Sequence, residues 1–270
     1  MTHGRRCRRA PDAGWGRREG TFPQMSDVTA YDVEYWHDAT RLLGHVCLPG
    51  AGRTGTAVLL LPDAYGVTEH MIGIAGRLAD RGHAVLVADL WGNRLLPVDQ
   101  AEFGPLIGAM AHDRERWLGR VRAAHAALLE QPEIEATAVV PLGYCFGGSS
   151  ALEYARTGAE VSGAISVHGG LDIIEFDWSA AGDAPVLVCT GADDPMATAD
   201  LRANLASALS RADTDWQMHV YGNTVHAFTS PLAKSSPRPD VVAYSARSTA
   251  RAWAATLGFL DEIDGSRLNA

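Results

Sequence analysis

Residues 141–150 read PLGYCFGGSS, and this short stretch predicts how the surrounding chain folds. An apolar run, AVV at 138–140, leads into it, and a helix is expected at 149–157. The glycines of the pattern Gly143-x-Cys145-x-Gly147 favour a sharp turn between strand and helix, with the cysteine at its apex. Cys145 is therefore either a nucleophile that the turn presents or a small buried residue within it.

Apolar, strand-like runs alternate with helical patterns on both sides of this turn. We expect strands at 30–36, 42–48, 57–62, 84–92, 136–143, 161–169, 184–191 and 215–222. Apolar residues recur at helical spacing around 71–78, from 113 to about 129, at 201–209 and at 241–260, whereas 93–112 is expected to be irregular. The alternation predicts one α/β domain over 25–270, with a mostly parallel central sheet and helices on both faces.

Three polar residues follow three of the predicted strands. Cys145 follows the strand at 136–143, Asp194 lies in GADDP (191–195), and His226 lies in YGNTVHAF (221–228). Parallel sheets place their ligands beyond the carboxyl ends of the strands, so these side chains are expected to lie close together. Their order along the chain, nucleophile then acid then histidine, is that of the α/β-hydrolase fold.

Each of these residue types has a role in acyl transfer. A thiol has a free pKa of about 8.5, and a nearby imidazole can take its proton and later protonate the leaving group. A carboxylate fixes the tautomer of the imidazole and stabilises its charged form. The helix after Cys145 points its N-terminus at the sulfur, and the amide of Phe146 is placed to form half of an oxyanion hole. The other half is expected from the loop at 63–66.

Taken singly, each residue also has a structural interpretation. Cys145 fits a tight turn, Asp194 or the neighbouring Asp193 fits a helix N-cap, and His226 fits a loop histidine. His168 and His219 show how common such histidines are, and both are left out of the predicted triad. The joint placement at strand ends, in the required order, favours the catalytic interpretation.

Composition excludes several function classes. The 270 residues are 47% hydrophobic and 20% charged, with a net charge of −9, and no apolar run approaches the ~20 residues that a membrane span needs. Residues 1–24 hold six of the 23 basic residues and two of the 32 acidic ones. The net charge of the remaining residues is therefore more negative than −9, which argues against nucleic acid as the main partner. We expect 1–24 to be a disordered extension, with Met25 as the functional start.

The four cysteines form no CxxC pair and, with the histidines, no zinc-ligand spacing. Cys47 and Cys189 lie in apolar strand-like runs and are expected to be inert core residues. This pattern of cysteines fits best a cytoplasmic protein that has no disulfide and binds no metal.

The motifs together resemble the dienelactone hydrolase family, a cysteine-nucleophile branch of the α/β-hydrolases. The resemblance covers about 25–260 and rests on LLLPDAYGV (59–67), RLADRGHAVLVADLWG (77–92), GYCFGG (143–148), SVHGG (166–170), TGADDP (190–195) and YGNTVHAF (221–228). It implies hydrolysis of lactones or esters through an acyl-thiol intermediate, without a metal or organic cofactor. It also implies a triad of Cys145, Asp194 and His226, with Ala64 and Phe146 as the oxyanion amides.

This sequence departs from the family pattern at three places. The best-known members carry a glutamate that partners the resting thiol where this chain has Asp63, which is one methylene shorter. They place an arginine four residues after the histidine, where Ser230 stands here, and another in the segment corresponding to 100–106, which has none. Because serine cannot copy the bidentate grip of arginine on a carboxylate, dienelactone itself is not the expected substrate.

The expected substrate is instead a small ester or lactone with an apolar or aromatic acyl group. The predicted pocket wall consists of Tyr65, Trp91, Phe103, Phe146 and Ser230. Two other hypotheses stay open. One is a non-hydrolytic biosynthetic enzyme that catalyses acyl transfer, lactone formation or rearrangement, and the other is a catalytically silent binding protein with the same fold. Beyond a small-molecule partner, the chain is expected to be a monomer or a homodimer.

Overall fold

The structure of the protein is a computed structural model that describes residues 28–50 and 55–268. The arginine-rich stretch 1–24 and Met25 lie outside these residues, and so do the expectations made for them. All the motifs that carry the predicted chemistry lie inside.

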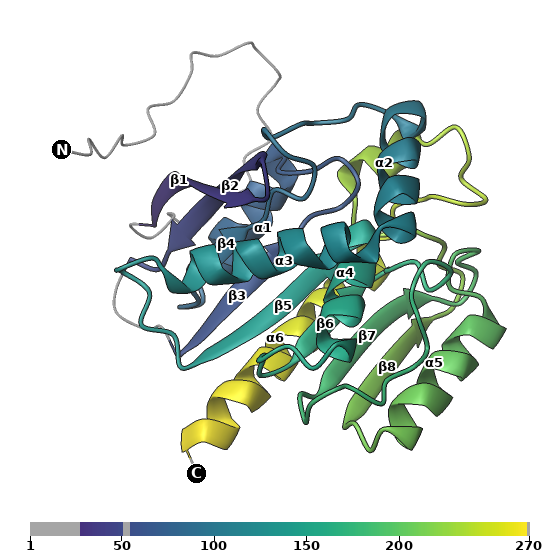
Figure 1. Ribbon diagram of the computed structural model, residues 1–270. Coiled ribbons are helices and arrows are strands. Elements are labelled where there is room, and N and C mark those ends of the chain that lie inside the picture. The colour runs from purple at the N-terminus through teal and green to yellow at the C-terminus, as the bar shows by residue number, and fades with distance from the viewer. Residues whose placement is uncertain (1–27, 51–54, 269–270) are drawn as a thin grey trace, which may run out of the picture.

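Eight strands form one central sheet: β1 (Thr29–His37), β2 (Thr40–Leu48), β3 (Thr56–Leu61), β4 (Val85–Val87), β5 (Ala138–Tyr144), β6 (Ala164–Val167), β7 (Val186–Gly191) and β8 (Trp216–Tyr221). Their order across the sheet is β1-β2-β4-β3-β5-β6-β7-β8 (Figure 1). β1 and β2 form an antiparallel hairpin and β2 pairs antiparallel with β4, while all later neighbours pair in parallel. The predicted mostly parallel sheet is confirmed.

The helices are α1 (Glu69–Ala79), α2 (Gln100–His112), α3 (Arg114–Leu129), α4 (Phe146–Arg156), α5 (Ala199–Arg211) and α6 (Ala246–Leu268), with a short 3-10 turn η1 (Pro231–Ser235). α1 and α6 pack on one face of the sheet, and α3, α4 and α5 pack on the other (Figure 1). Helices on both faces are the predicted arrangement, and together with the strand order they give the α/β-hydrolase fold.

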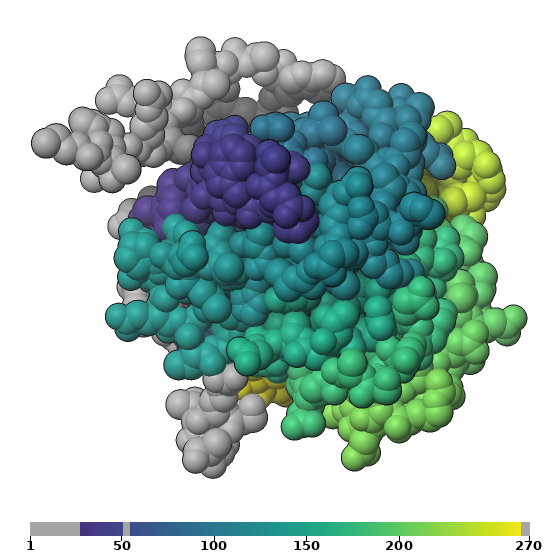
Figure 2. Space-filling view, viewed as in Figure 1, coloured from purple at the N-terminus to yellow at the C-terminus, as the bar shows by residue number. Residues whose placement is uncertain are grey.

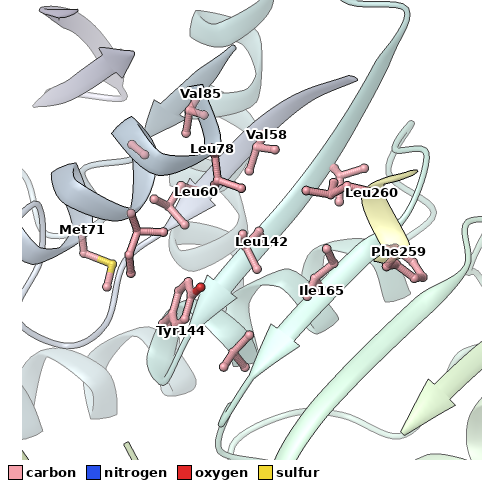
Figure 3. Packing of buried hydrophobic residues seen from close by; sticks show 14 of the residues in the cluster. Val58, Leu60, Met71, Leu78, Val85, Leu142, Tyr144, Ile165, Phe259 and Leu260 are labelled. Carbon is pink, nitrogen blue, oxygen red and sulfur yellow. The ribbon is translucent and has the colours of Figure 1, made fainter. Parts of the chain in front are cut away.

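The central strands are apolar throughout because both of their faces are covered. Along β3, Val58 and Leu60 point toward α1 and α6, whereas Ala57 and Leu59 point toward α3 and α4. Figure 3 shows the first of these layers, in which side chains of β3, β5 and β6 meet Met71 and Leu78 of α1 and Phe259 and Leu260 of α6. The packed layers hold the carboxyl ends of the strands in fixed positions.

The β1–β2 hairpin lies against α3, and the two form one continuous surface in the space-filling view (Figure 2). The hydroxyl of Tyr31 on β1 donates to the side chain of Gln131, just after α3, at 3.1 Å. The antiparallel edge of the sheet is thus attached to the helical layer on the α3 face.

Three expectations about local structure are wrong. Residues 100–112 form α2 rather than irregular chain, because Asp99 caps the helix by accepting from the amides of Ala101 (2.9 Å) and Glu102 (3.2 Å). The strand expected at 84–92 ends at Val87, because the Asp89 carboxylate accepts from the amides of Trp91 and Gly92 and turns the chain. α4 also begins three residues earlier than expected, directly after Cys145.

Candidate active site

The turn between β5 and α4 holds Cys145 in a backbone conformation that few residues other than glycine adopt, with φ +53° and ψ −117°. The glycines on both sides make this turn possible. A Cβ on Gly143 would lie 1.8 Å from the Gly147 carbonyl oxygen, and one on Gly147 would lie 2.0 Å from that of Leu61. Strand and helix therefore approach so closely that only glycine fits, and the Cys145 side chain, which is partly exposed, stands at the apex.

Cys145, His226 and Asp194 form a connected chain of hydrogen bonds. Nε2 of His226 lies 3.1 Å from Sγ of Cys145, and Nδ1 of His226 lies 2.9 Å from Oδ2 of Asp194. Asp194 follows β7, and its Oδ1 also accepts from the amide of Met196 at 2.9 Å. His226 and Asp194 are 3% and 2% exposed, so solvent does not compete for these bonds. The structure thus brings together the three residues predicted from separate strand ends.

The surroundings of His226 favour its protonated form. Burial alone would lower the pKa of His226, but the negative charge of the Cys145 thiolate and the hydrogen bonds to Asp194 and Cys145 raise it to about 10. A cysteine sulfur next to an imidazole that a carboxylate supports is an arrangement suited to nucleophilic attack on a carbonyl carbon.

The loop after β3 lies beside this chain of hydrogen bonds. Ala64 is buried, and its carbonyl oxygen accepts from the indole nitrogen of Trp91 at 3.1 Å, which fixes the loop. Phe146 is the first residue of α4, so its amide has no acceptor within the helix. The two amides predicted as oxyanion donors thus belong to segments that the glycine turn holds together.

Asp63 does not pair with the thiol in this structure. Its Oδ1 accepts from the amide of Tyr65 at 3.0 Å, and among the described residues no hydrogen bond joins it to Cys145. The short side chain bonds back to its own loop instead of extending toward the sulfur. Burial raises the pKa of Asp63 to about 6, although the Tyr65 amide and the charge of His226 act in the opposite direction.

The predicted pocket residues fall into two groups. The rings of Tyr65 and Phe103 are both partly exposed and meet edge to face at 5.3 Å between centroids. Trp91 and Phe146 are buried and stack at 4.9 Å, and Trp117 stacks on the other side of Phe146 at 5.0 Å. Ser230 is also buried, with its backbone in the turn that begins η1.

One residue at the site that sequence reasoning set aside is His168. It follows β6, the strand beside β5, and its Nδ1 accepts from the backbone amide of Cys145 at 3.1 Å. The signal that could have found it is its position in SVHGG (166–170), directly at a strand end next to the cysteine turn. His219, also set aside, lies exposed on β8.

The described part of the chain lacks two features that other classes of protein have. It contains no helix that is both long and apolar enough to cross a membrane. It also contains no group of three histidine, cysteine, aspartate or glutamate side chains placed to hold a metal ion.

Several known proteins are similar to this chain in sequence or in fold. A sequence model described as the dienelactone hydrolase family matches residues 44–264. A solved dienelactone hydrolase-like promiscuous phosphotriesterase from metagenomic libraries is 36% identical, with a TM-score of 0.82, covering 87% of this chain and 98% of its own. A dienelactone hydrolase of Anabaena variabilis, 21% identical, has the same fold with a TM-score of 0.60, covering 87% and 98%.

A curated relative, hydrolase pyvD of Aspergillus violaceofuscus, is 23% identical over 79% of this chain and 80% of its own. The match of the family model extends over most of the chain and includes all the site residues described above. The chain therefore belongs to the dienelactone hydrolase family and is an ester or lactone hydrolase.

Proposed function

We propose that this protein hydrolyses a small, uncharged ester or lactone through an acyl-thiol intermediate on Cys145. The observation that carries the proposal is the position of the His226 ring, with Nε2 at 3.1 Å from Sγ of Cys145 and Nδ1 at 2.9 Å from the Asp194 carboxylate. Each ring nitrogen of His226 then has a defined partner. This is what a histidine requires if it acts first as a general acid and later as a general base.

The reaction follows in two halves. In the first, the Cys145 thiolate attacks the carbonyl carbon, and the amides of Ala64 and Phe146 stabilise the oxyanion, each contributing ~3 kcal/mol. The carbon–oxygen bond of the ester breaks, and His226 protonates the departing alkoxide. In the second half, His226 takes a proton from water, the hydroxide attacks the acyl carbon, and the carbon–sulfur bond breaks. This step releases the carboxylic acid and restores the thiolate beside the imidazolium.

The residues around the site favour an acyl group without a carboxylate. Position 230 and the segment 100–106 contain no arginine, and α2, which holds that segment, presents Phe103 to Tyr65. The exposed parts of these two rings offer an apolar wall near the loop that carries Ala64. An aryl or alkyl ester, or an uncharged lactone, fits this chemistry better than a dicarboxylic substrate.

A substrate panel with matched variants tests the proposal. Aryl esters and uncharged lactones are expected to turn over, and Cys145→Ala is expected to lower kcat/KM by about 10³-fold or more. Cys47→Ala, which alters a buried cysteine on β2 away from the turn, serves as the control and is expected to keep the activity. If Cys145→Ala retained full turnover, the nucleophile would be another group and the proposal would fail.

The same panel separates the competing functions. An amine or alcohol acceptor, added with the ester, reveals acyl transfer if it consumes the acyl group faster than water does. An aryl phosphotriester belongs in the panel as well, because a structure 36% identical to this chain is described as a promiscuous phosphotriesterase. A wild-type protein that reacts with no ester, lactone, thioester or phosphotriester would favour a binding function on this fold.

A further inference from the structure

The backbone amide of Cys145 has two acceptors rather than one. It donates to the carbonyl oxygen of Val167 at 3.0 Å and to Nδ1 of His168 at 3.1 Å. Both acceptors come from the end of β6, the parallel neighbour of β5. The strained residue at the apex of the turn is therefore held from the side by an imidazole ring.

The opposite nitrogen of the same ring is also bonded. Nε2 of His168 lies 2.7 Å from Oγ1 of Thr229, and both side chains are buried, at 2% and 8% exposure. Because Nδ1 accepts from an amide that can only donate, the ring proton must reside on Nε2, and Thr229 accepts it. The Cys145 amide requires this neutral tautomer, and the threonine hydroxyl stabilises it by accepting the proton on Nε2.

The ring of His168 is packed tightly enough to transmit this constraint. Its centroid lies 5.0 Å from that of Phe228, 5.8 Å from that of Tyr144 and 5.5 Å from that of His226, each at a steep angle. Burial and the positive charge of His226 lower the pKa of His168 well below its ordinary value, so the ring stays neutral beside the imidazolium. One ring therefore contacts both the residue that carries the thiol and the residue that activates it.

We propose that His168, held in its Nε2–H tautomer by Thr229, is a positioning residue that fixes the Cys145 turn for attack. The proposal rests on the acyl-thiol function stated above. Rotation of the peptide between Tyr144 and Cys145 would move Sγ relative to Nε2 of His226 and the Phe146 amide relative to the oxyanion. The bond to His168 opposes that rotation at the point where the backbone is most strained, at φ +53°.

A pair of variants at Thr229 separates tautomer control from packing. Thr229→Val keeps the shape of the side chain but removes the acceptor, so Nε2–H is left unsatisfied and the ring can change tautomer. We expect kcat for an aryl ester to fall about 10- to 100-fold while KM changes less than about 3-fold. Thr229→Ser keeps the hydroxyl and is expected to retain kcat within about 3-fold.

Nitrogen NMR of histidine-labelled protein supplies a readout that packing alone would not move. In the wild type, His168 is expected to show an unprotonated Nδ1 and a protonated Nε2, and Thr229→Val is expected to lose this pattern while Thr229→Ser keeps it. A wild-type proton on Nδ1 would overturn the proposal. It would also be overturned if Thr229→Val and Thr229→Ser had the same kcat, or if His168→Phe, which fills the same space, kept full activity.

The acyl-thiol chemistry can fail independently of this proposal. If that chemistry is wrong, Cys145→Ala remains active. If only the positioning role is wrong, Cys145→Ala is inactive, while Thr229→Val turns over as fast as the wild type.

Discussion

Asp194 holds the ring of His226 in one orientation, because its carboxylate accepts the proton on Nδ1 of that ring. Asp194→Asn offers an amide that can donate to Nδ1 and so favours the wrong tautomer. We expect kcat to fall about 10²- to 10⁴-fold with KM nearly unchanged, measured with the best aryl ester.

Asp193→Asn is the matched control for this change, because Asp193 is the preceding residue but is exposed. It is expected to leave kcat within about 2-fold of the wild type, since exposed substitutions away from the reacting groups rarely matter. Equal losses in the two variants would show that charge near the loop, and not the bond to His226, matters.

The burial of Asp63 leads to a second prediction, which concerns the pH dependence of the free energy of unfolding. Burial raises its pKa from 3.8 to about 6, so the folded protein binds more protons than the unfolded chain between about pH 4 and pH 6. The stability of the wild type therefore falls as pH rises through that window, because a buried carboxylate must ionise. Asp63→Asn removes this cost and is expected to raise the free energy of unfolding by about 2–3 kcal/mol at pH 8.

Denaturant titrations at pH 8 and below pH 4 measure this effect. The difference between Asp63→Asn and the wild type should shrink toward zero at the lower pH, where both folded and unfolded states carry the proton. An equal difference at both pH values would mean that the substitution acts through packing and not through ionisation.

The sequence predicts the role of a residue when that role follows from its position at the end of one strand. It does not predict a role that depends on a partner from a neighbouring strand. Cys145, Asp194 and His226 each follow a recognisable strand, so their meeting was predictable. The bonds of His168 depend on the register of β6 against β5 and on a threonine 61 residues away. Nothing in the local pattern of SVHGG specifies that pairing.

At the scale of elements, the turn between β5 and α4 tolerates no side chain at its glycines. In Gly147→Ala the new Cβ would lie 2.0 Å from the backbone oxygen of Leu61 on β3, and neither backbone can move without disturbing the sheet. We expect a loss of more than about 3 kcal/mol in the free energy of unfolding, or failure to fold, as judged by denaturant titration and yield.

A glycine in α1 supplies the contrast. A Cβ on Gly73 meets nothing within 4 Å, so Gly73→Ala is expected to stabilise the protein by about 0.5–1 kcal/mol through helix propensity. If both alanine variants had similar stability, the close approach of α4 to β3 would be wrong.

The elements with regular apolar patterns were predicted well, and the irregular ones were not. β3, β5 and β7 are buried on both faces and read as continuous apolar runs. α2 was missed because Gly104, Pro105 and Gly108 interrupt its pattern, and Met110 is its one buried residue. Its cap at Asp99 was the available signal.

At the scale of the whole molecule, Glu153 on α4 connects parts that are distant in sequence. Its carboxylate is fully buried and bonds to Arg114 at the start of α3 (2.6 Å), to Arg156 (3.0 Å) and to the amide of Glu175 (2.7 Å). Glu153→Ala leaves those donors without their partner and is expected to lower the free energy of unfolding by roughly 3 kcal/mol.

Glu115→Ala is the control, because Glu115 pairs with Arg122 on the exposed surface of α3. Exposed pairs contribute about 0–1 kcal/mol, so little change is expected in the same denaturant titration. Similar losses in the two variants would mean that the Glu153 network does not hold the α3 and α4 layer together.

The central claim is that an acyl group resides on Cys145 during turnover. The direct measurement is rapid acid quenching of the wild type with an aryl ester, followed by intact-protein mass spectrometry and peptide mapping. We predict one added acyl mass per chain, on the peptide that contains Cys145, and its absence in Cys145→Ala. An acyl group on any other residue, or steady turnover with no covalent adduct, would contradict the account.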